Sequence, residues 1–192
     1  MLKKLLLPFI AILFIAGCAT PSNNLILNPT IANANPDPSL MGQTLSINAS
    51  DARQDKALAK VNREGKLVTL MASREPGYLM QEVIDRQMRD RGYMIGNNGN
   101  ASLQLTINEL FADVQEGNLR YSINTIIDLS ITVQAKNGAT FTKNYRTSHT
   151  IQGALTANNQ NITNALNMGL SEIIAVMAKD ASVHEFIKQN SR

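Results

Sequence analysis

The sequence is poor in the side chains that build disulfides, metal centres and catalytic sites. Its 192 residues include one cysteine, two histidines and no tryptophan. A single cysteine cannot form an intramolecular disulfide, and isolated histidines make a poor metal site. The sequence also lacks the G-x-S-x-G, P-loop, G-x-G-x-x-G, H-E-x-x-H and C-x-x-C patterns. It therefore predicts no catalytic, cofactor-binding or metal-binding residue, and no enzyme.

The few candidates for chemistry have ordinary structural interpretations. His149 lies in a predicted strand, where a solvent-facing ring is typical, and His184 lies in the first turn of a predicted helix. Spacing alone does not exclude two carboxylates facing each other across a sugar cleft. Pairs of carboxylates three or four residues apart occur in two predicted loops, at Asp51 and Asp55 and at Asp113 and Glu116.

The N-terminus is apolar but too short to span a membrane. A spanning helix needs about 20 apolar residues, whereas the run of residues 5–16 is shorter and contains Pro8. Lys3 and Lys4 precede this run, and small residues follow it. These are the three parts of a secretory signal, so residues 1–17 are predicted to be a signal peptide.

The only cysteine stands directly after this segment. The stretch Ile15-Ala16-Gly17-Cys18 resembles the bacterial lipobox. The resemblance implies that the Cys18 sulfur takes a diacylglycerol, that the chain is cut before Cys18, and that the freed amine takes a third acyl chain, such as palmitate. Ala19 follows the cysteine, and in this respect the chain resembles lipoproteins that are sorted to the outer membrane. The alternative is that Cys18 is a small residue after a conventional signal peptide. We expect a lipid-anchored protein on the outer membrane, facing the periplasm.

The balance of charge argues against nucleic acid as a partner. The full chain has 18 basic and 15 acidic side chains, and removal of Lys3 and Lys4 leaves 16 against 15. A nearly neutral chain has no electrostatic attraction for a polyanion. The predicted partners are the membrane, through the acyl chains on Cys18, and an envelope protein or peptide.

Residues 18–39 are predicted to be a lipidated N-terminus and flexible tether that contributes nothing to the core. Proline and asparagine are frequent there and disfavour helices and central strands. The apolar residues 25–27 are the exception. They can add an edge strand to the domain or lie on the membrane, and the edge strand is favoured.

Residues 40–192 are predicted to form one α+β domain. We expect a mostly antiparallel sheet with two long helices packed on one face and a short C-terminal helix. A slip in the alternating pattern at Ile126 and Ile127 predicts either a bulge or a stretch that is covered on both faces. The predicted strands are at 45–49, 58–62, 66–70, 93–95, 103–107, 119–135 and 140–153, with hairpin turns at Gly65 and at Asn137-Gly138. The predicted helices are one capped by Ser73 and ended by Gly92, one at 162–177 capped by residues 158–161, and one at 182–189.

Two surfaces are predicted to serve recognition. One is an exposed sheet edge, because the strands carry few charges to block it. The other is the polar loop of residues 51–60, with Arg53 and Lys56, although a solvated connection is the simpler interpretation.

Several stretches resemble the YajG-type family of enterobacterial lipoproteins across essentially the whole mature chain. They are residues 37–42, 55–61, 91–94, 143–146 and 184–190. The resemblance implies a lipid-anchored envelope protein without an assigned activity, and Cys18 is the one functional position that it transfers. The sequence thus favours a non-catalytic periplasmic binding or assembly domain. The alternative is a periplasmic enzyme acting on cell-wall material.

Overall fold

The structure is a computed structural model that describes residues 22–190. The predicted signal peptide and Cys18 lie outside the described residues. The elements in chain order are β1 (Asn24–Leu25), the 3₁₀ helix η1 (Pro38–Leu40), β2 (Thr44–Asp51), β3 (Ala59–Arg63), β4 (Lys66–Ala72), α1 (Pro76–Arg91), β5 (Met94–Ile95), β6 (Ala101–Glu116), β7 (Arg120–Ala135), β8 (Thr140–Ala154), α2 (Asn159–Lys179) and α3 (Ser182–Asn190).

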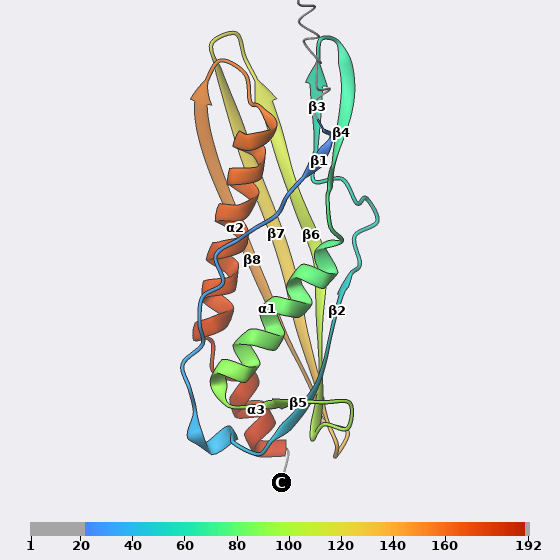
Figure 1. The fold of residues 1–192 in the computed structure, drawn as a ribbon, viewed down its shortest axis with the longest axis vertical. Coiled ribbons are helices and arrows are strands. Elements are labelled where there is room, and N and C mark those ends of the chain that lie inside the picture. The colour runs from blue at the N-terminus through green and yellow to red at the C-terminus, as the bar shows by residue number, and fades with distance from the viewer. Residues whose placement is uncertain (1–21, 191–192) are drawn as a thin grey trace, which may run out of the picture.

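Three long strands, β6, β7 and β8, run along the length of an elongated molecule (Figure 1). Every second side chain of β7 is buried, which is the pattern of a strand with one face in the core. The bulge predicted in β7 is wrong, because the β7–β8 register runs without a shift from Arg120 to Gln134. The register instead shifts in β6, between Ile107 and Glu109.

The predicted mostly antiparallel sheet with two long helices on one face is wrong. The sheet is mixed, because β2 runs parallel to β6, β1 runs parallel to β4, and β3 meets β6 in parallel at Ala59 and Ala112. The two long helices also have different strand partners. α1 contacts β2, β5 and β6, whereas α2 contacts β6, β7 and β8. The alternation of apolar and polar residues shows which face of a strand is buried, but it does not show which strand lies alongside. Two parallel strands are joined by a crossover connection, and the residue pattern of a strand does not reveal that connection.

Side-chain caps and a glycine fix the ends of the long helices. Glu75, not the predicted Ser73, caps α1, and Gly92 ends it as predicted. A capping box of Asn158 and Asn161 opens α2. Gly169 lets α2 approach the sheet closely, since a Cβ atom there would lie 2.9 Å from the Ile127 Cδ1 atom.

Buried polar contacts join the two long helices. The Gln87 side chain donates to the Ile174 carbonyl oxygen at 2.9 Å, and the Arg91 guanidinium donates to the Asp180 carbonyl oxygen at 3.0 Å. The Ile174 carbonyl lies in the C-terminal part of α2, and Asp180 directly follows the helix. These bonds fix the C-terminal half of α2 against α1.

The described part of the predicted tether lies against the domain. β1 pairs with β4, so the predicted edge strand is confirmed. The backbone N–H of Asn28 donates to Asn167 and that of Thr30 donates to Ser171, both on α2, and Figure 1 shows the segment running along this helix. The prediction that residues 19–38 contribute nothing to the core is wrong for the described part, because Leu25 belongs to the core cluster. The chain boundaries at residues 17 and 39 stay predictions.

This arrangement predicts that Leu25 is essential for stability and that its neighbour is not. Leu25 is 2 % exposed and Ile26 is 70 % exposed. Leu25→Ala should lower the free energy of unfolding by about 3 kcal/mol, because it leaves a cavity. Ile26→Ala is the matched control and should change it by less than about 0.5 kcal/mol. Urea unfolding followed by circular dichroism measures both. Equal midpoints for the two variants would show that the N-terminal segment does not pack in solution.

Candidate functional site

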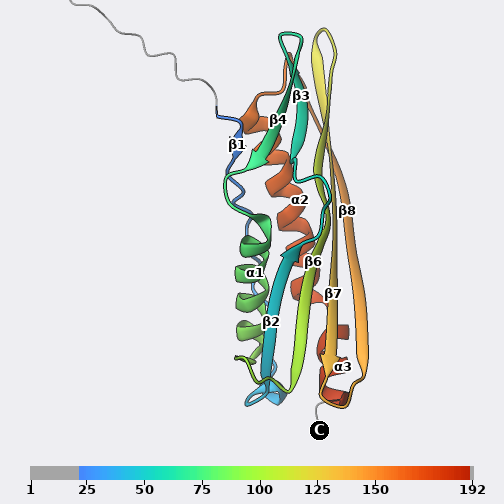
Figure 2. The ribbon, with the colours of Figure 1, turned by 90° about the vertical axis from the view of Figure 1, so that its right-hand side faces the viewer.

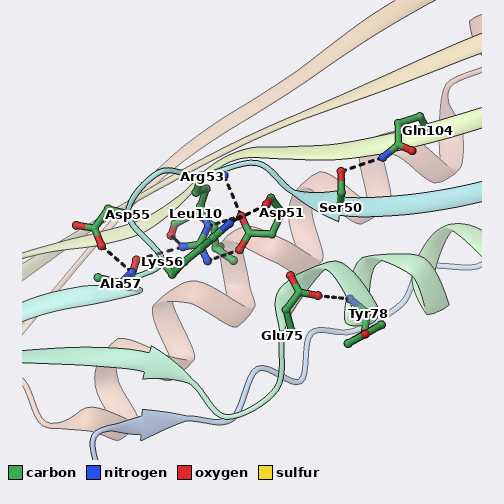
Figure 3. A network of polar contacts seen from close by, with 10 residues as sticks. All are labelled: Ser50, Asp51, Arg53, Asp55, Lys56, Ala57, Glu75, Tyr78, Gln104 and Leu110. Carbon is green, nitrogen blue, oxygen red and sulfur yellow. Dashed lines mark hydrogen bonds and ion pairs between the residues drawn. The ribbon is translucent and has the colours of Figure 1, made fainter.

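The polar loop predicted as a recognition surface is built around a buried arginine (Figure 3). The Arg53 Nε and Nη2 atoms donate to the Asp51 carboxylate at 3.0 and 2.8 Å. The Nη1 atom donates to the carbonyl oxygens of Ala57 and Leu110, at 3.1 and 2.7 Å. One guanidinium therefore ties the end of β2, the following loop and the centre of β6 together.

The carboxylates of this loop also make hydrogen bonds and ion pairs within the loop. Burial alone raises the pKa of Asp51, but the hydrogen bonds from Arg53 outweigh it and the net pKa is lowered. Asp55 accepts the Ala57 N–H at 2.9 Å and pairs with Lys60 at 2.7 Å. Asp51 and Asp55 are thus held by separate cationic partners and do not form a carboxylate pair. The loop hypothesis is wrong for Arg53, which is not available to a partner.

This geometry predicts opposite outcomes for the two cations of the loop. Arg53→Ala leaves the Asp51 carboxylate buried with little compensation and should lower the free energy of unfolding by about 3 kcal/mol. The Lys56 side chain is 46 % exposed, and its ammonium lies 3.3 Å from an Asp51 carboxylate oxygen. Lys56→Ala should therefore cost no more than about 1 kcal/mol. Chemical denaturation compares the two variants, and similar losses would mean that the Arg53 bonds contribute nothing beyond a surface ion pair.

The two histidines lie on different elements and in different surroundings. His184 is buried in α3, with its ring centroid 5.8 Å from that of Tyr93. Burial, reinforced by the nearby charge of Arg91, lowers the pKa of His184 to about 3, so the ring is neutral in the folded domain. His149 is half-buried in β8, opposite Thr125. Within residues 22–190, no group of three His, Cys, Asp or Glu side chains could hold a metal ion.

A groove of about 980 Å³ opens between the β3–β4 hairpin and the start of α2. Val68 and Leu70 supply apolar walls. The Glu116 carboxylate in its lining pairs with Arg63 at 3.2 Å and accepts the Ala157 N–H at 2.9 Å. The other carboxylate predicted beside it, Asp113, is exposed on β6. Glu116 therefore closes the loop before α2, and its bonds give it a structural role.

The free edge of β8 is the surface that sequence reasoning predicted only in general terms. Among the described strands, β8 pairs with β7 alone, over all 15 of its residues. Figure 2 shows it as the right-hand boundary of the sheet. The strand has no proline, no bulge and no acidic residue. Its one inward-pointing cation, Lys143, lies 3.4 Å from Asp180. Natural sheets rarely leave so long and regular an edge open, because its unpaired N–H and C=O groups accept further strands.

The chain is similar to a family of lipoproteins. A family model described as "Uncharacterized lipoprotein" matches residues 29–188. The chain is 50% identical over 192 residues, and over the full length of both chains, to the uncharacterized lipoprotein YajG of Escherichia coli K12, and it matches YajG of the O6:H1 strain CFT073 equally well. The predicted resemblance is confirmed, and these relatives carry no enzymatic name.

A solved structure shares the fold at low sequence similarity. The crystal structure of a Xanthomonas campestris protein is 15% identical, covers 85% of this chain and 96% of its own, and superposes with a TM-score of 0.52. This likeness concerns the fold alone. As for membrane spans, none of the helices within residues 22–190 is both long and apolar enough to cross a bilayer.

Proposed function

This chain belongs to the family of uncharacterised lipoproteins that includes YajG, and from this premise we propose a lipid-anchored, non-catalytic binding protein. Acyl chains on Cys18 hold it on the outer membrane, and the domain faces the periplasm. There the free edge of β8 binds an extended segment of an envelope protein. The observation that carries the proposal is the 15-residue β8 strand with one neighbour among the described strands.

The anchor follows from the lipobox and from the energetics of acyl chains. Each buried CH₂ group contributes about 0.8 kcal/mol, so one chain binds marginally and several bind for good. The outer membrane, rather than the inner one, is supported by Ala19 directly after the predicted acylated cysteine.

Replacement of the predicted acylation site tests the anchor. Cys18→Ser removes the thiol that would take the lipid, so we expect loss of palmitate labelling and release of the protein from the membrane fraction. Separation of inner and outer membranes by density then tests the location of the wild-type protein. Continued palmitate labelling of the Cys18→Ser protein would rule out this anchor.

Strand addition suits the edge of β8 for chemical reasons. A partner segment would take its affinity from main-chain hydrogen bonds and its specificity from alternate side chains. The outward row of β8 is mostly uncharged, and Arg146 is its one cation. It therefore places little charge repulsion in the path of a neighbouring strand. Because Arg146 already lies 3.5 Å from Glu109 and from Asp128, the row suits a segment of mostly neutral character. The exposed residues of this row are Thr140, Thr142, Asn144, Arg146, Ser148, Thr150, Gln152 and Ala154.

Photo-crosslinking in living cells tests the edge. A photoreactive residue at Asn144 or Ser148 should capture one partner several-fold more strongly than the same residue at Ser102. Ser102 is the matched control, because it is exposed on β6 but has strands on both sides. On binding of the captured segment, amide hydrogen exchange should slow in β8. Equal capture from Ser102, or slowed exchange confined to other strands, would reject the edge as the binding site.

A further inference from the structure

Three exposed leucines gather at one end of the molecule. Leu67 is 73 % exposed, Leu119 is 77 % exposed and Leu155 is 66 % exposed. Leu67 lies beside the β3–β4 turn, Leu119 lies in the β6–β7 turn, and Leu155 directly follows β8. Figures 1 and 2 show both hairpins ending at the same end of the long axis. The Leu155 N–H donates to the Leu119 carbonyl oxygen at 3.0 Å, so these two residues are neighbours. We call the three residues the leucine tip.

The backbone at the tip holds one leucine in a strained conformation. Leu155 has a φ of 64°, in the left-handed region. Glycine or asparagine occupies this region more readily than a leucine does. A strained residue that keeps an apolar side chain in solvent needs a functional explanation, because relief of the strain by substitution would be simple.

Basic residues flank the leucines along the chain. Lys66 precedes Leu67, and Arg120 follows Leu119, and both cations are exposed. Surfaces that lie in the headgroup layer of a bilayer combine apolar side chains with Lys or Arg, which the anionic headgroups attract. Glu64 in the β3–β4 turn is exposed as well. The tip therefore combines apolar side chains with a small excess of basic charge, which suits a phospholipid surface.

The N-terminal strand sets how far the tip can stand from the lipid anchor. β1 runs parallel to β4, with Asn24 opposite Met71. Met71 is four residues beyond Leu67, so Asn24 lies about 13 Å from the level of Leu67. Cys18 is six residues before Asn24. Because six residues span at most about 20 Å, the backbone of Cys18 can lie at most about 7 Å beyond the level of Leu67.

We propose that the leucine tip docks into the headgroup layer of the bilayer that holds the acyl chains of Cys18. This inference rests on the proposed acylation. Leu67 and Leu119 enter the layer from two hairpins, with Leu155 beside Leu119, while Lys66 and Arg120 meet anionic headgroups. The two hairpins give the domain two separated points of support, so its long axis stands up from the membrane.

Depth-dependent quenching tests the docking. The chain has one cysteine, and acylation consumes its thiol, so Leu67→Cys and Leu119→Cys each provide a unique site for a fluorophore. The labelled, acylated protein is placed in vesicles of phosphatidylethanolamine and phosphatidylglycerol that carry spin-labelled lipid. Quenching at both tip positions should exceed that at Met94→Cys by about fivefold. Met94 is the matched control, being 60 % exposed in β5, at the opposite end. Equal quenching at all three positions would overturn the proposal.

A second measurement separates the tip from the anchor. The mature Cys18→Ser protein has no acyl chains and leaves the membrane fraction of cells, so its weak, reversible binding to vesicles at high lipid concentration reports the tip alone. Replacement of Leu67, Leu119 and Leu155 by Gln should lower its co-sedimentation with the same vesicles about tenfold, whereas Met41→Gln with Met94→Gln should leave it unchanged. An equal loss in both variants would count against the tip.

The intact mass of the wild-type protein reports its acylation independently of the tip. If the wild-type protein is acylated but the tip positions show no excess quenching, the tip proposal is rejected and the anchor is kept. If the wild-type protein is not acylated but binds vesicles through the tip, the anchor is rejected and the tip proposal is kept.

Measuring Tm and vesicle binding together distinguishes a docking role of Leu155 from a purely structural one. Leu155→Asn relieves the strained φ, because asparagine tolerates this region. We expect a higher Tm together with weaker vesicle binding. A lower Tm would show that the Leu155 side chain supports the fold, and unchanged vesicle binding would remove it from the docking surface.

Discussion

The parallel pairing of β2 with β6 is the constraint from which the rest of the architecture follows. Two parallel strands cannot be joined by a tight turn, so the chain must cross over between them. That crossover contains the β3–β4 hairpin, α1 and β5, and it places α1 against β2. With one side of β6 taken by β2, the antiparallel strands β7 and β8 can be added on the other side only. β8 therefore becomes an edge, and α2 returns along the sheet to cover its inner side.

Local features of the fold could be predicted from the sequence because their causes are local. Gly65 adopts a φ of 80° in the predicted hairpin turn, and Gly92 ends α1. The sheet order could not be predicted, since alternation records burial without naming the neighbouring strand. The predicted position of the bulge is wrong because a break in the apolar pattern does not identify the strand in which the register shifts. The slip at Ile126 and Ile127 breaks the apolar pattern of β7, whereas the register shift lies in β6. Leu25 was missed as a core residue because proline and asparagine surround it.

The functional site was predictable to a similar, limited extent. A loop with Arg53, Asp55 and Lys56 has the composition of an exposed surface, and no sequence pattern reveals that the guanidinium reaches the Leu110 carbonyl oxygen on β6. The sheet edge was predicted as a type of surface, but its assignment to β8 required the strand order. The acylation of Cys18 stays a prediction, and it rests on a linear motif that does not depend on the fold.

The proposed anchor and the proposed binding edge constrain each other through the direction of β8. This strand runs from Thr140, at the end of the molecule opposite the leucine tip, to Ala154, beside it. Its 15 residues span about 50 Å. With the tip on the bilayer, the open edge rises from the membrane surface into the periplasm instead of lying along it. A partner strand on that edge would run along the membrane normal. Such an edge suits a segment that leaves or approaches the membrane, because a segment lying flat on the bilayer would meet only the last residues of β8.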